Sequence, residues 1–507
     1  MTGQRSLGFS SPLQGVIVRV SLQVQGLGVA LPILDITPWQ LLVLFQHEML
    51  LFAGIFFLLG AIDDFAVDLV WLWLKLTGRA RSKRVDGAQL ATAELAGSAA
   101  IFVPTWHEAG VIRDTIAHAL GAWPQDNLRL YVGCYRNDAE TIAAVMSAAP
   151  GDPRLRLVIH DRPGPSTKAD CLNRLYRALL EDEARTGCMA RMVVFHDAED
   201  MVDPAALKLL DEAIGSAEFV QLPVLPLPQA NSRWLGSHYC EEFAEAHAKG
   251  LVVRDALGAA IPSAGVGCAA SRAAVARLAE ARGGDAPFEA ESLTEDYEMG
   301  LRIAEQGGRC RFLRKRHLNG ELIATRAYFP ARLDHVVRQK TRWIHGIAFQ
   351  GWDRLGWNAS SGKIHLAEQW MRMRDRRGPL TALVLFTGYL LLVLSALAGL
   401  AAAIGRAPTI ELTTGIKLLL AANFAAFVWR AGWRFGFTAR EFGLAEGFRA
   451  VLRIPITNII AIMAGRRALA AYVRSLAGQD VVWDKTPHFD HPSRSSPAMA
   501  PLAKATA

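Results

Sequence analysis

The chain has 507 residues, which is too long for one ordinary domain and leaves room for two or three. A hydrophobic fraction of 51% and a mean hydropathy of +0.18 are high for a soluble enzyme. The net charge of +7 is a mild basic excess of the kind that Lys and Arg produce when they flank membrane spans, so it does not call for a nucleic-acid partner. The six cysteines show no CxxC spacing and no zinc-type pairing with histidine, which favours buried thiols in a reducing compartment.

Residues 1–77 are predicted to form an N-terminal membrane region without a removable signal peptide. The apolar stretch at about 41–62 is long enough to cross roughly 30 Å of hydrocarbon. Because a charge in lipid is costly, we expect the polar residues in its first half to lie near an interface or to face another helix; these are Gln46, His47 and Glu48. The shorter amphipathic run after Asp64 is predicted to be a separate interfacial helix. Residues 1–35 are not counted as a span.

The polar middle of the chain, residues 95–370, is predicted to be a globular α/β domain. Short runs rich in β-branched residues alternate there with helical segments, and the runs are AAIFVP, LRLYVG, LRLVIH, RMVVFH and EFVQLP. Such alternation is typical of successive βα units. We therefore expect a doubly wound, mostly parallel sheet.

Two further spans are predicted within residues 379–432. Leu380–Ile404 is the most apolar stretch of the chain, and Thr414–Val428 follows a turn-rich connector, so the pair resembles a helical hairpin. The remaining residues, 433–507, are predicted to hold interfacial helices and a polar tail. Within them, Ile454–Ala464 is apolar but short, and is interpreted as interfacial or re-entrant.

Clusters of basic residues predict the orientation of these spans. Every cluster adjoins either the central domain or the C-terminal tail, so the positive-inside rule places both in the cytoplasm. We accordingly expect a multi-pass protein of a bacterial inner membrane with a cytosolic central domain. The clusters are Lys75–Arg84, Arg372–Arg377 and Arg430–Arg440.

Asp197 and Glu199 follow the predicted strand RMVVFH. Ligands of open α/β sheets collect at the carboxyl ends of strands, and carboxylates two residues apart can share a divalent cation with a diphosphate. An acidic loop that caps the next helix explains the same residues, and this pair by itself slightly favours that explanation.

A second acidic motif is Thr294-Glu295-Asp296, at the start of a helical pattern. Thr294 suits an N-cap, and acids in a first turn favour the helix dipole. Taken alone, capping is again the better explanation.

The third motif is Gln339-Lys340-Thr341-Arg342-Trp343. On a helix, Gln339, Arg342 and Trp343 occupy positions i, i+3 and i+4 and so share one face. A guanidinium suits a diphosphate, and an indole suits stacking on a sugar ring. A basic and aromatic surface helix is the alternative interpretation.

The order of these three motifs resembles the family 2 glycosyltransferases, in particular the membrane-integrated branch that includes cellulose and hyaluronan synthases. Pro104 to Glu108 are similar to the family's nucleotide-pocket motif, and Lys168 to Asn173 to its KAxxLN element. The resemblance covers roughly Ser98–Trp352. The segment Val482–His488, VWDKTPH, is similar to the bacteriophage adsorption protein B group within the family.

The resemblance implies a GT-A fold and an inverting transfer from a nucleotide-sugar, with a UDP-sugar expected. By the family pattern, Asp296 is the general base, Arg342 stabilises the leaving diphosphate, and Gln339 and Trp343 line the acceptor path. The expected cofactor is Mg²⁺ or Mn²⁺ on Asp197 and Glu199. The expected donor-binding residues are Pro104, Glu108, Asp138, Lys168 and Asp197.

The expected partners are a glycan or lipid-linked acceptor, membrane lipid and an outer-membrane export partner. The sequence departs from the family in having D-A-E for D-x-D and in lacking an asparagine before Glu108. About three spans are few for a polymer-conducting pore. Two alternatives therefore stay open: a transferase that loads a sugar onto a polyprenyl-phosphate lipid, and a non-catalytic membrane scaffold of an envelope complex.

Overall fold

The structure, a computed structural model, describes residues 37–357, 365–408, 410–478 and 491–494. The chain divides into two compact units, Met1–Ile62 with Val384–Phe427 and Asp63–Leu383 with Val428–Ala507. The segment VWDKTPH, which carries part of the family resemblance, lies outside the described residues, and so do residues 1–35.

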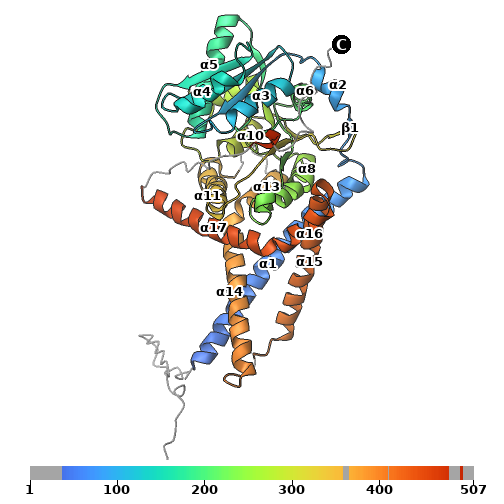
Figure 1. The fold of residues 1–507 in the computed structure, drawn as a ribbon. Helices are drawn as coiled ribbons and strands as arrows, with labels where there is room; N and C mark the ends of the chain where they lie inside the picture. Colours follow the sequence, from blue (N-terminus) through green and yellow to red (C-terminus); the bar gives the residue numbers. More distant parts are fainter. Residues whose placement is uncertain (1–36, 358–364, 409, 479–490, 495–507) are drawn as a thin grey trace, which may run out of the picture. The chain divides into compact units, whose positions relative to one another are not determined.

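A seven-stranded sheet forms the centre of the larger unit (Figure 1). Its strand order is β4-β3-β2-β5-β8-β6-β9, in which β8 is antiparallel to both neighbours and every other pair is parallel. Two short parallel ladders, β1 with β10 and β7 with β11, complete the strands. The strands are β1 (Arg84–Val85), β2 (Ser98–Pro104), β3 (Leu128–Tyr135), β4 (Leu155–His160), β5 (Ala190–Phe195), β6 (Phe219–Gln221), β7 (Val224–Pro226), β8 (Cys268–Ser271), β9 (Cys310–Phe312), β10 (Arg316–His317) and β11 (Thr325–Ala327).

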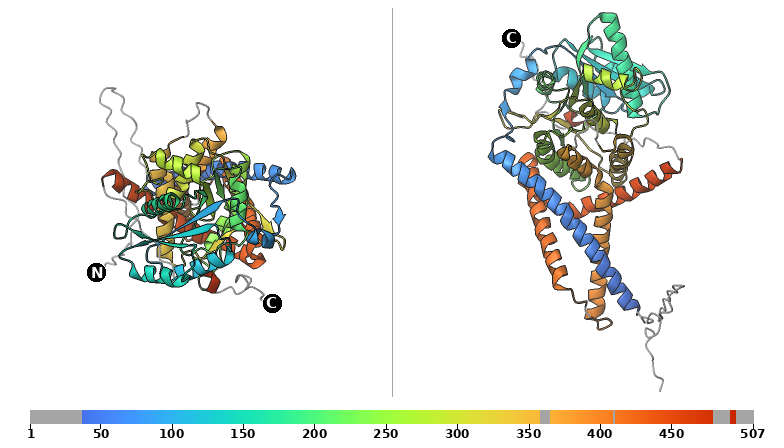
Figure 2. Two further views of the ribbon diagram at one scale, coloured as in Figure 1. Left: turned by 90° about the horizontal axis from the view of Figure 1, so that it is seen from above. Right: turned by 180° about the vertical axis from the view of Figure 1, so that it is seen from behind.

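Helices cover both faces of this sheet (Figure 2). Successive side chains of a strand point to opposite faces, so Ile101 packs in one buried cluster and Phe102 in the other. The first cluster includes residues of α3 (Ile112–Ala122), α4 (Ala139–Ala148) and α6 (Ala206–Ile214), and the second includes residues of α5 (Lys168–Thr186), α9 (Arg272–Glu280) and α10 (Glu295–Glu305). This two-sided burial explains why the strands are nearly continuously apolar, and it confirms the predicted doubly wound, mostly parallel sheet.

The other helices of the larger unit are mostly short. Two stretches have the wider π-helical winding, η2 and η3, and two are 3₁₀ turns, η1 and η4. The helices are α2 (Gly87–Thr92), α3 (Ile112–Ala122), α4 (Ala139–Ala148), α5 (Lys168–Thr186), α6 (Ala206–Ile214), η1 (Ala230–Ser232), α7 (His238–Glu245), η2 (Ala246–Gly250), α8 (Leu251–Ala256), α9 (Arg272–Glu280), α10 (Glu295–Glu305), α11 (Leu333–Ile344), η3 (His345–Gln350), α12 (Gly351–Leu355), α13 (Leu366–Arg376), α16 (Leu444–Leu452), α17 (Ile454–Leu476) and η4 (Pro492–Arg494).

The first long helix, α1, runs from Pro38 to Leu76 without a break (Figure 1). The prediction of a span followed by a separate interfacial helix is therefore wrong at this point. Two neighbouring acids, Asp63 and Asp64, were the signal for a break, but they are paired with arginines. Arg377 Nη1 lies 2.7 Å from Asp63 Oδ2, and Arg374 Nη2 lies 2.9 Å from Asp64 Oδ1. With these charges paired and no glycine or proline after Asp63, the helix continues.

Polar contacts join the helices within the smaller unit. Gln46 Nε2 donates a hydrogen bond of 2.7 Å to Ser395 Oγ, which confirms that this polar residue faces another helix. Asn423 Nδ2 donates to the carbonyl of Gly54 at 3.0 Å, and a Cβ at Gly54 would lie only 2.7 Å from the side chain of Leu419. Small residues and interhelical hydrogen bonds of this kind are typical of helices that associate in membranes.

Three described helices are long and apolar enough to cross a membrane: α1, α14 (Gly378–Ala403) and α17. The predicted second span corresponds to α14. The predicted third span lies in α15 (Thr414–Phe442), which falls outside this set because Lys417, Asn423 and Arg430 interrupt its apolar stretch.

The helix predicted to be short and interfacial, α17, is 23 residues long and belongs to that set. One side of α17 packs against α11, where Ile460 is buried in a cluster with Val336 and Val337. Its other side carries exposed apolar residues, among them Ile459 and Leu469.

Candidate active site

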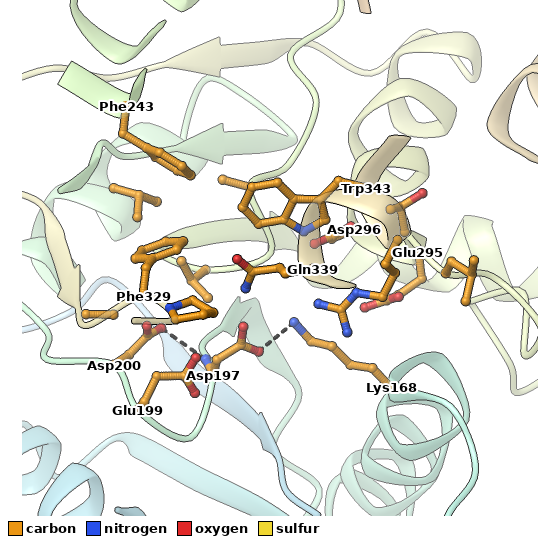
Figure 3. A pocket seen from close by; sticks show the side chains of 18 of the residues that line it. Lys168, Asp197, Glu199, Asp200, Phe243, Glu295, Asp296, Phe329, Gln339 and Trp343 are labelled. Carbon is orange, nitrogen blue, oxygen red and sulfur yellow. Dashed lines mark hydrogen bonds and ion pairs between the residues drawn. The ribbon is translucent and has the colours of Figure 1, made fainter. Parts of the chain in front are cut away.

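Seven of the ten predicted site residues line one pocket of about 90 Å³ in the larger unit (Figure 3). They come from the N-terminus of α5, the loop after β5, the first turn of α10 and the second half of α11. These seven residues are Lys168, Asp197, Glu199, Asp296, Gln339, Arg342 and Trp343. The sheet order explains part of this convergence, because parallel strands present their carboxyl ends at one edge.

The loop after β5 carries three acids that line the pocket. The buried Asp200 organises it, accepting a hydrogen bond of 3.0 Å from the backbone N–H of Asp197 and lying 2.8 Å from His196 Nδ1. Burial raises the pKa of Asp200, and the contact with His196 opposes this rise. Asp200 therefore holds the loop that presents Asp197 and Glu199.

Lys168, at the start of α5, supplies a positive charge among these acids. Its Nζ lies 2.5 Å from Asp197 Oδ1, an ion pair that Figure 3 shows across the floor of the pocket. Burial alone would lower the pKa of Lys168, but the carboxylates of Asp197, Glu295 and Asp296 outweigh it and raise the pKa. The ammonium is therefore charged at neutral pH.

The predicted general base, Asp296, lies in the first turn of α10 and also lines the pocket. The two interpretations of this motif, an acid at a helix start and a pocket residue, therefore both hold. Thr294 occupies the N-cap without a side-chain capping hydrogen bond. Burial raises the pKa of Asp296, while Lys168 opposes this rise. Burial and the charge of Asp296 together raise the pKa of Glu295 to about 8. Both carboxyl groups therefore hold protons more strongly than a solvated acid.

A glycine loop lies directly against Asp296. Gly265 has a φ of +82°, and a Cβ there would lie 2.4 Å from Asp296 Oδ2 and 3.4 Å from Lys168 Nζ. Gln221 fixes the loop, accepting from the N–H of Ala264 at 2.8 Å and donating to the carbonyl of Val266 at 2.8 Å. Only a residue without a side chain leaves room for the carboxylate at this point.

Helix α11 brings the third motif into the pocket, and the predicted shared face is confirmed. Gln339 accepts a hydrogen bond of 2.6 Å from the buried hydroxyl of Tyr239. Arg342 has a buried Nε without a hydrogen-bond partner among the described residues, and its charge opposes the raised pKa values of Glu295 and Asp296. Trp343 completes a face that combines an amide, a guanidinium and an indole.

Sequence reasoning missed an aromatic wall around Trp343. Its ring lies 6.4 Å from that of Phe243 and 6.5 Å from that of Phe329, measured between centroids, and Tyr239 lies at 6.0 Å. Phe243 comes from α7 and Phe329 follows β11, so no local motif joins them. In the sequence these aromatic residues are scattered, and only the fold brings them together, so the sequence gives little sign of the wall.

The three remaining predicted residues lie at the ends of β2 and β3 and do not line the pocket. Pro104 ends β2 beside Gly133 of β3. Asp138 is buried at the N-cap of α4, where it accepts from the N–H of Thr141 at 3.3 Å and of His107 at 2.6 Å. The N–H of Glu108 donates to Thr141 Oγ1 at 3.0 Å. Their contact with a nucleoside stays a prediction.

The pocket fits a divalent cation that is bound together with a diphosphate. No group of three His, Cys, Asp or Glu side chains in the described ranges could hold an ion by itself. Mg²⁺, however, is usually held by one or two carboxylates together with substrate phosphates and water. Asp197 and Glu199 provide two carboxylates on one wall, and the ammonium of Lys168 on Asp197 shows that this wall attracts positive charge.

Comparisons with known proteins identify relatives of this chain. The chain is 33% identical over 468 residues to bacteriophage adsorption protein B of Escherichia coli K12, and equally to bacteriophage N4 adsorption protein B of E. coli O157:H7. These alignments cover 87% of the chain but only 61% of each relative.

Two solved structures give weaker matches. One is the mannosyltransferase PcManGT of Pyrobaculum calidifontis with GDP-Man and Mn²⁺, at TM-score 0.47 and 19% identity, over 81% of this chain and 99% of that chain. The other is glucosyl-3-phosphoglycerate synthase of Mycobacterium tuberculosis with phosphoglyceric acid, at TM-score 0.32 and 16% identity, over 54% and 85% of the two chains. The family description "glycosyltransferase like family 2" matches residues 96–346, the segment that holds the sheet and the pocket. Residues 96–346 of the chain thus form a domain of the glycosyltransferase family 2 type.

Proposed function

We propose that the protein is an inverting glycosyltransferase of a bacterial inner membrane, which uses a nucleotide-sugar, expected to be a UDP-sugar, to build a cell-surface or exported glycan. One observation carries the proposal: the partly buried Asp296, two neighbouring carboxylates, two cationic side chains and an aromatic wall meet in one pocket of a family 2 domain. The proposal combines that geometry with the expectations for the family.

The donor diphosphate would lie beside Lys168 and the loop after β5. The ammonium of Lys168 and the guanidinium of Arg342 are the positive charges of the pocket, and they would stabilise the negative charge that grows on the departing diphosphate. A Mg²⁺ or Mn²⁺ ion on Asp197 and Glu199 would neutralise part of the same charge. Glu108 and Asp138 would lie towards the nucleoside.

Asp296 would act as the general base. Its carboxylate would take the proton of an acceptor hydroxyl as that oxygen forms a bond to the anomeric carbon of the sugar. The bond from that carbon to the diphosphate breaks at the same time, and its electron pair leaves with the nucleoside diphosphate. A raised pKa suits this role, because general bases work best when their pKa lies near the working pH.

The acceptor would approach along α11. The Tyr239 hydroxyl donates to the Gln339 amide oxygen and so orients the amide, whose N–H groups would donate to an acceptor oxygen. Trp343 and the rings of Phe243 and Phe329 offer apolar faces of the kind on which sugar rings pack. A glycan suits this wall, and so does a lipid-linked sugar.

The membrane location rests on sequence and helices together. Three described helices are long and apolar enough to cross a bilayer, and the basic clusters beside the family 2 domain favour a cytosolic domain. The name of the matched relatives refers to phage adsorption, a cell-surface event, which supports a surface product and an outer-membrane partner.

The test is nucleoside diphosphate release by the purified, detergent-solubilised chain with a panel of nucleotide-sugars and Mn²⁺ or Mg²⁺. Release with one donor that disappears in Asp296→Asn would support the proposal and name the sugar. A matched control is Asp334→Asn, because Asp334 is also an acid in a first helical turn but is exposed. Loss of release in both variants would point away from a specific base.

The two alternatives predict different products. The small number of candidate spans among the described residues leaves open single transfer to a polyprenyl-phosphate lipid, which would give a short, solvent-extractable product instead of a polymer. A non-catalytic scaffold would release no nucleoside diphosphate with any donor or acceptor.

A further inference from the structure

The loop after β5 has its backbone carbonyls held from outside by side chains. Thr115 Oγ1 donates to the carbonyl of Ala198, and His118 Nε2 lies 2.9 Å from that of Val202. Trp123 Nε1 donates to the carbonyl of Asp203 at 3.1 Å. All three side chains belong to α3 or its C-cap, so one helix holds the outer side of the loop that presents Asp197 and Glu199.

A fourth carbonyl of this loop faces the C-terminal part of the chain. His491, fully buried, places Nε2 at 3.4 Å from the carbonyl of Asp200, almost 300 residues away in sequence. His491 Nδ1 accepts from the backbone N–H of Ser493 at 3.2 Å and lies 2.7 Å from the Ser493 hydroxyl, an arrangement that favours the ring hydrogen on Nε2, where it points at the loop.

The same C-terminal residues are fastened to α3. Arg494 Nε donates to Asp114 Oδ2 at 2.6 Å, and its Nη2 donates to the carbonyl of Gly110 at 2.5 Å. Pro492, next to His491, is also buried. Residues 491–494, called the tail segment here, thus dock on the helix that holds the other three carbonyls, and His491 contacts the carbonyl of Asp200.

Asp200, the residue that His491 contacts, links the tail segment to the site. The backbone of Asp200 meets His491, while its side chain accepts from the N–H of Asp197. A shift of the Asp200 backbone would therefore move the carboxylate that pairs with Lys168. Simple packing of a chain end would bury apolar side chains, but it would not require a ring N–H aimed at this loop.

We propose that residues 491–494 form a positioning clamp, which orders the Asp197–Asp200 loop for the metal and the donor diphosphate. Affinity for both would then depend on the docked tail. The effect of the clamp on catalysis rests on the proposed function. The ordering of the Asp197–Asp200 loop by residues 491–494 does not depend on it.

The first test is a charge swap read by hydrogen exchange in the full-length, detergent-solubilised chain. The variants are Arg494→Asp, Asp114→Arg and the two combined. Each single variant should speed amide exchange in peptides covering 196–204 by roughly three- to tenfold, the factor expected when about one hydrogen bond is lost. The double variant should return exchange towards the native rate.

A matched control is Arg282→Glu, which reverses one charge of the partly exposed Arg282–Glu289 pair. Exchange in 196–204 should not change there. If neither single variant alters the loop, or if the swap restores nothing, the clamp is overturned.

The second test replaces the histidine. His491→Phe keeps a ring without an N–H group, whereas His491→Gln keeps a donor. Electron paramagnetic resonance of free Mn²⁺ in the presence of UDP measures affinity without turnover, and Phe should weaken it by about three- to tenfold and Gln by less. In the transfer assay the donor KM should rise while kcat at saturating Mn²⁺ changes little. Equal affinity in all three proteins would refute the clamp.

These readouts separate the clamp from the proposed function. If the native protein transfers no sugar with any donor, the proposed function fails, and hydrogen exchange still decides whether the tail orders the loop. If transfer occurs but the loop ignores the tail, the clamp alone fails.

Discussion

Two neighbouring regions at the same edge of the sheet surround their carboxylates with different groups. At the ends of β2 and β3, Asp138 is buried and accepts hydrogen bonds from the N–H groups of His107 and Thr141. At the end of β5 and the start of α10, burial and the charge of Asp197 raise the pKa of Asp296, and the charges of Lys168 and Arg342 oppose this rise. The first region uses its acid to fix a loop, while the second concentrates charge in a pocket.

The difference shows that the surroundings of an acid at a strand end decide whether it serves structure or chemistry. A carboxylate that accepts hydrogen bonds from backbone N–H groups of two segments, as Asp138 does, holds those segments together. A carboxylate held by burial and other charges is poised to exchange a proton or to meet a ligand. The following substitutions would break or sharpen this contrast.

The largest effect is expected from Asp296→Asn. An amide cannot take a proton, so kcat should fall by about 10²- to 10⁴-fold, the usual contribution of a general base. Donor binding, measured by calorimetry with the nucleoside diphosphate, should remain within a small factor of the native value. Full activity in this variant would remove Asp296 from the mechanism.

Lys168→Met should come next. It removes the larger of the two positive charges that oppose the raised pKa of Asp296, so that pKa should rise further. Because the base works only when deprotonated, the acid limb of the pH–rate profile should move to higher pH. Rates should also fall about 10- to 100-fold through the loss of one preorganised charge at the diphosphate. An unshifted acid limb would mean that Lys168 and Asp296 do not interact during catalysis.

Gly265→Ala should lower kcat through a clash with Asp296, and Gly258→Ala gives a matched control. Both glycines have positive φ, +82° and +69°, but a Cβ at Gly258 meets no atom within 4 Å. Both variants should lose about 1–2 kcal/mol of stability in thermal unfolding, the cost of a left-handed alanine. Only Gly265→Ala should show a lower kcat. An equal fall of kcat in the two variants would mean that backbone strain, and not the clash with Asp296, causes the effect.

The smallest effect on chemistry is expected from Asp138→Ala. Loss of the cap should lower the free energy of unfolding by about 0.5–2 kcal/mol, whereas Asp138→Asn, which keeps a capping oxygen, should cost less. The donor KM should rise while kcat changes little, as steady-state kinetics can show. A large fall in kcat in both variants would place Asp138 with Asp296 instead.

Much of the fold could be predicted because its signals are local. The five apolar runs became β2 to β6, since buried parallel strands must be apolar on both faces. The shared face of Gln339, Arg342 and Trp343 followed from helical spacing alone. The predicted end of the first helix after Ile62 was wrong. Asp63 and Asp64 pair with Arg374 and Arg377, which are distant in sequence, and this pairing lets the helix continue.

The sequence by itself therefore determined the element types, the family 2 motifs and the order in which they occur, because these depend on residues a few positions apart. The tertiary structure alone decided which acids share a pocket, how burial shifts the pKa of Asp296, and that Phe243, Phe329 and the tail at His491 adjoin the site. These properties depend on contacts between residues tens to hundreds of positions apart, which no local spacing encodes.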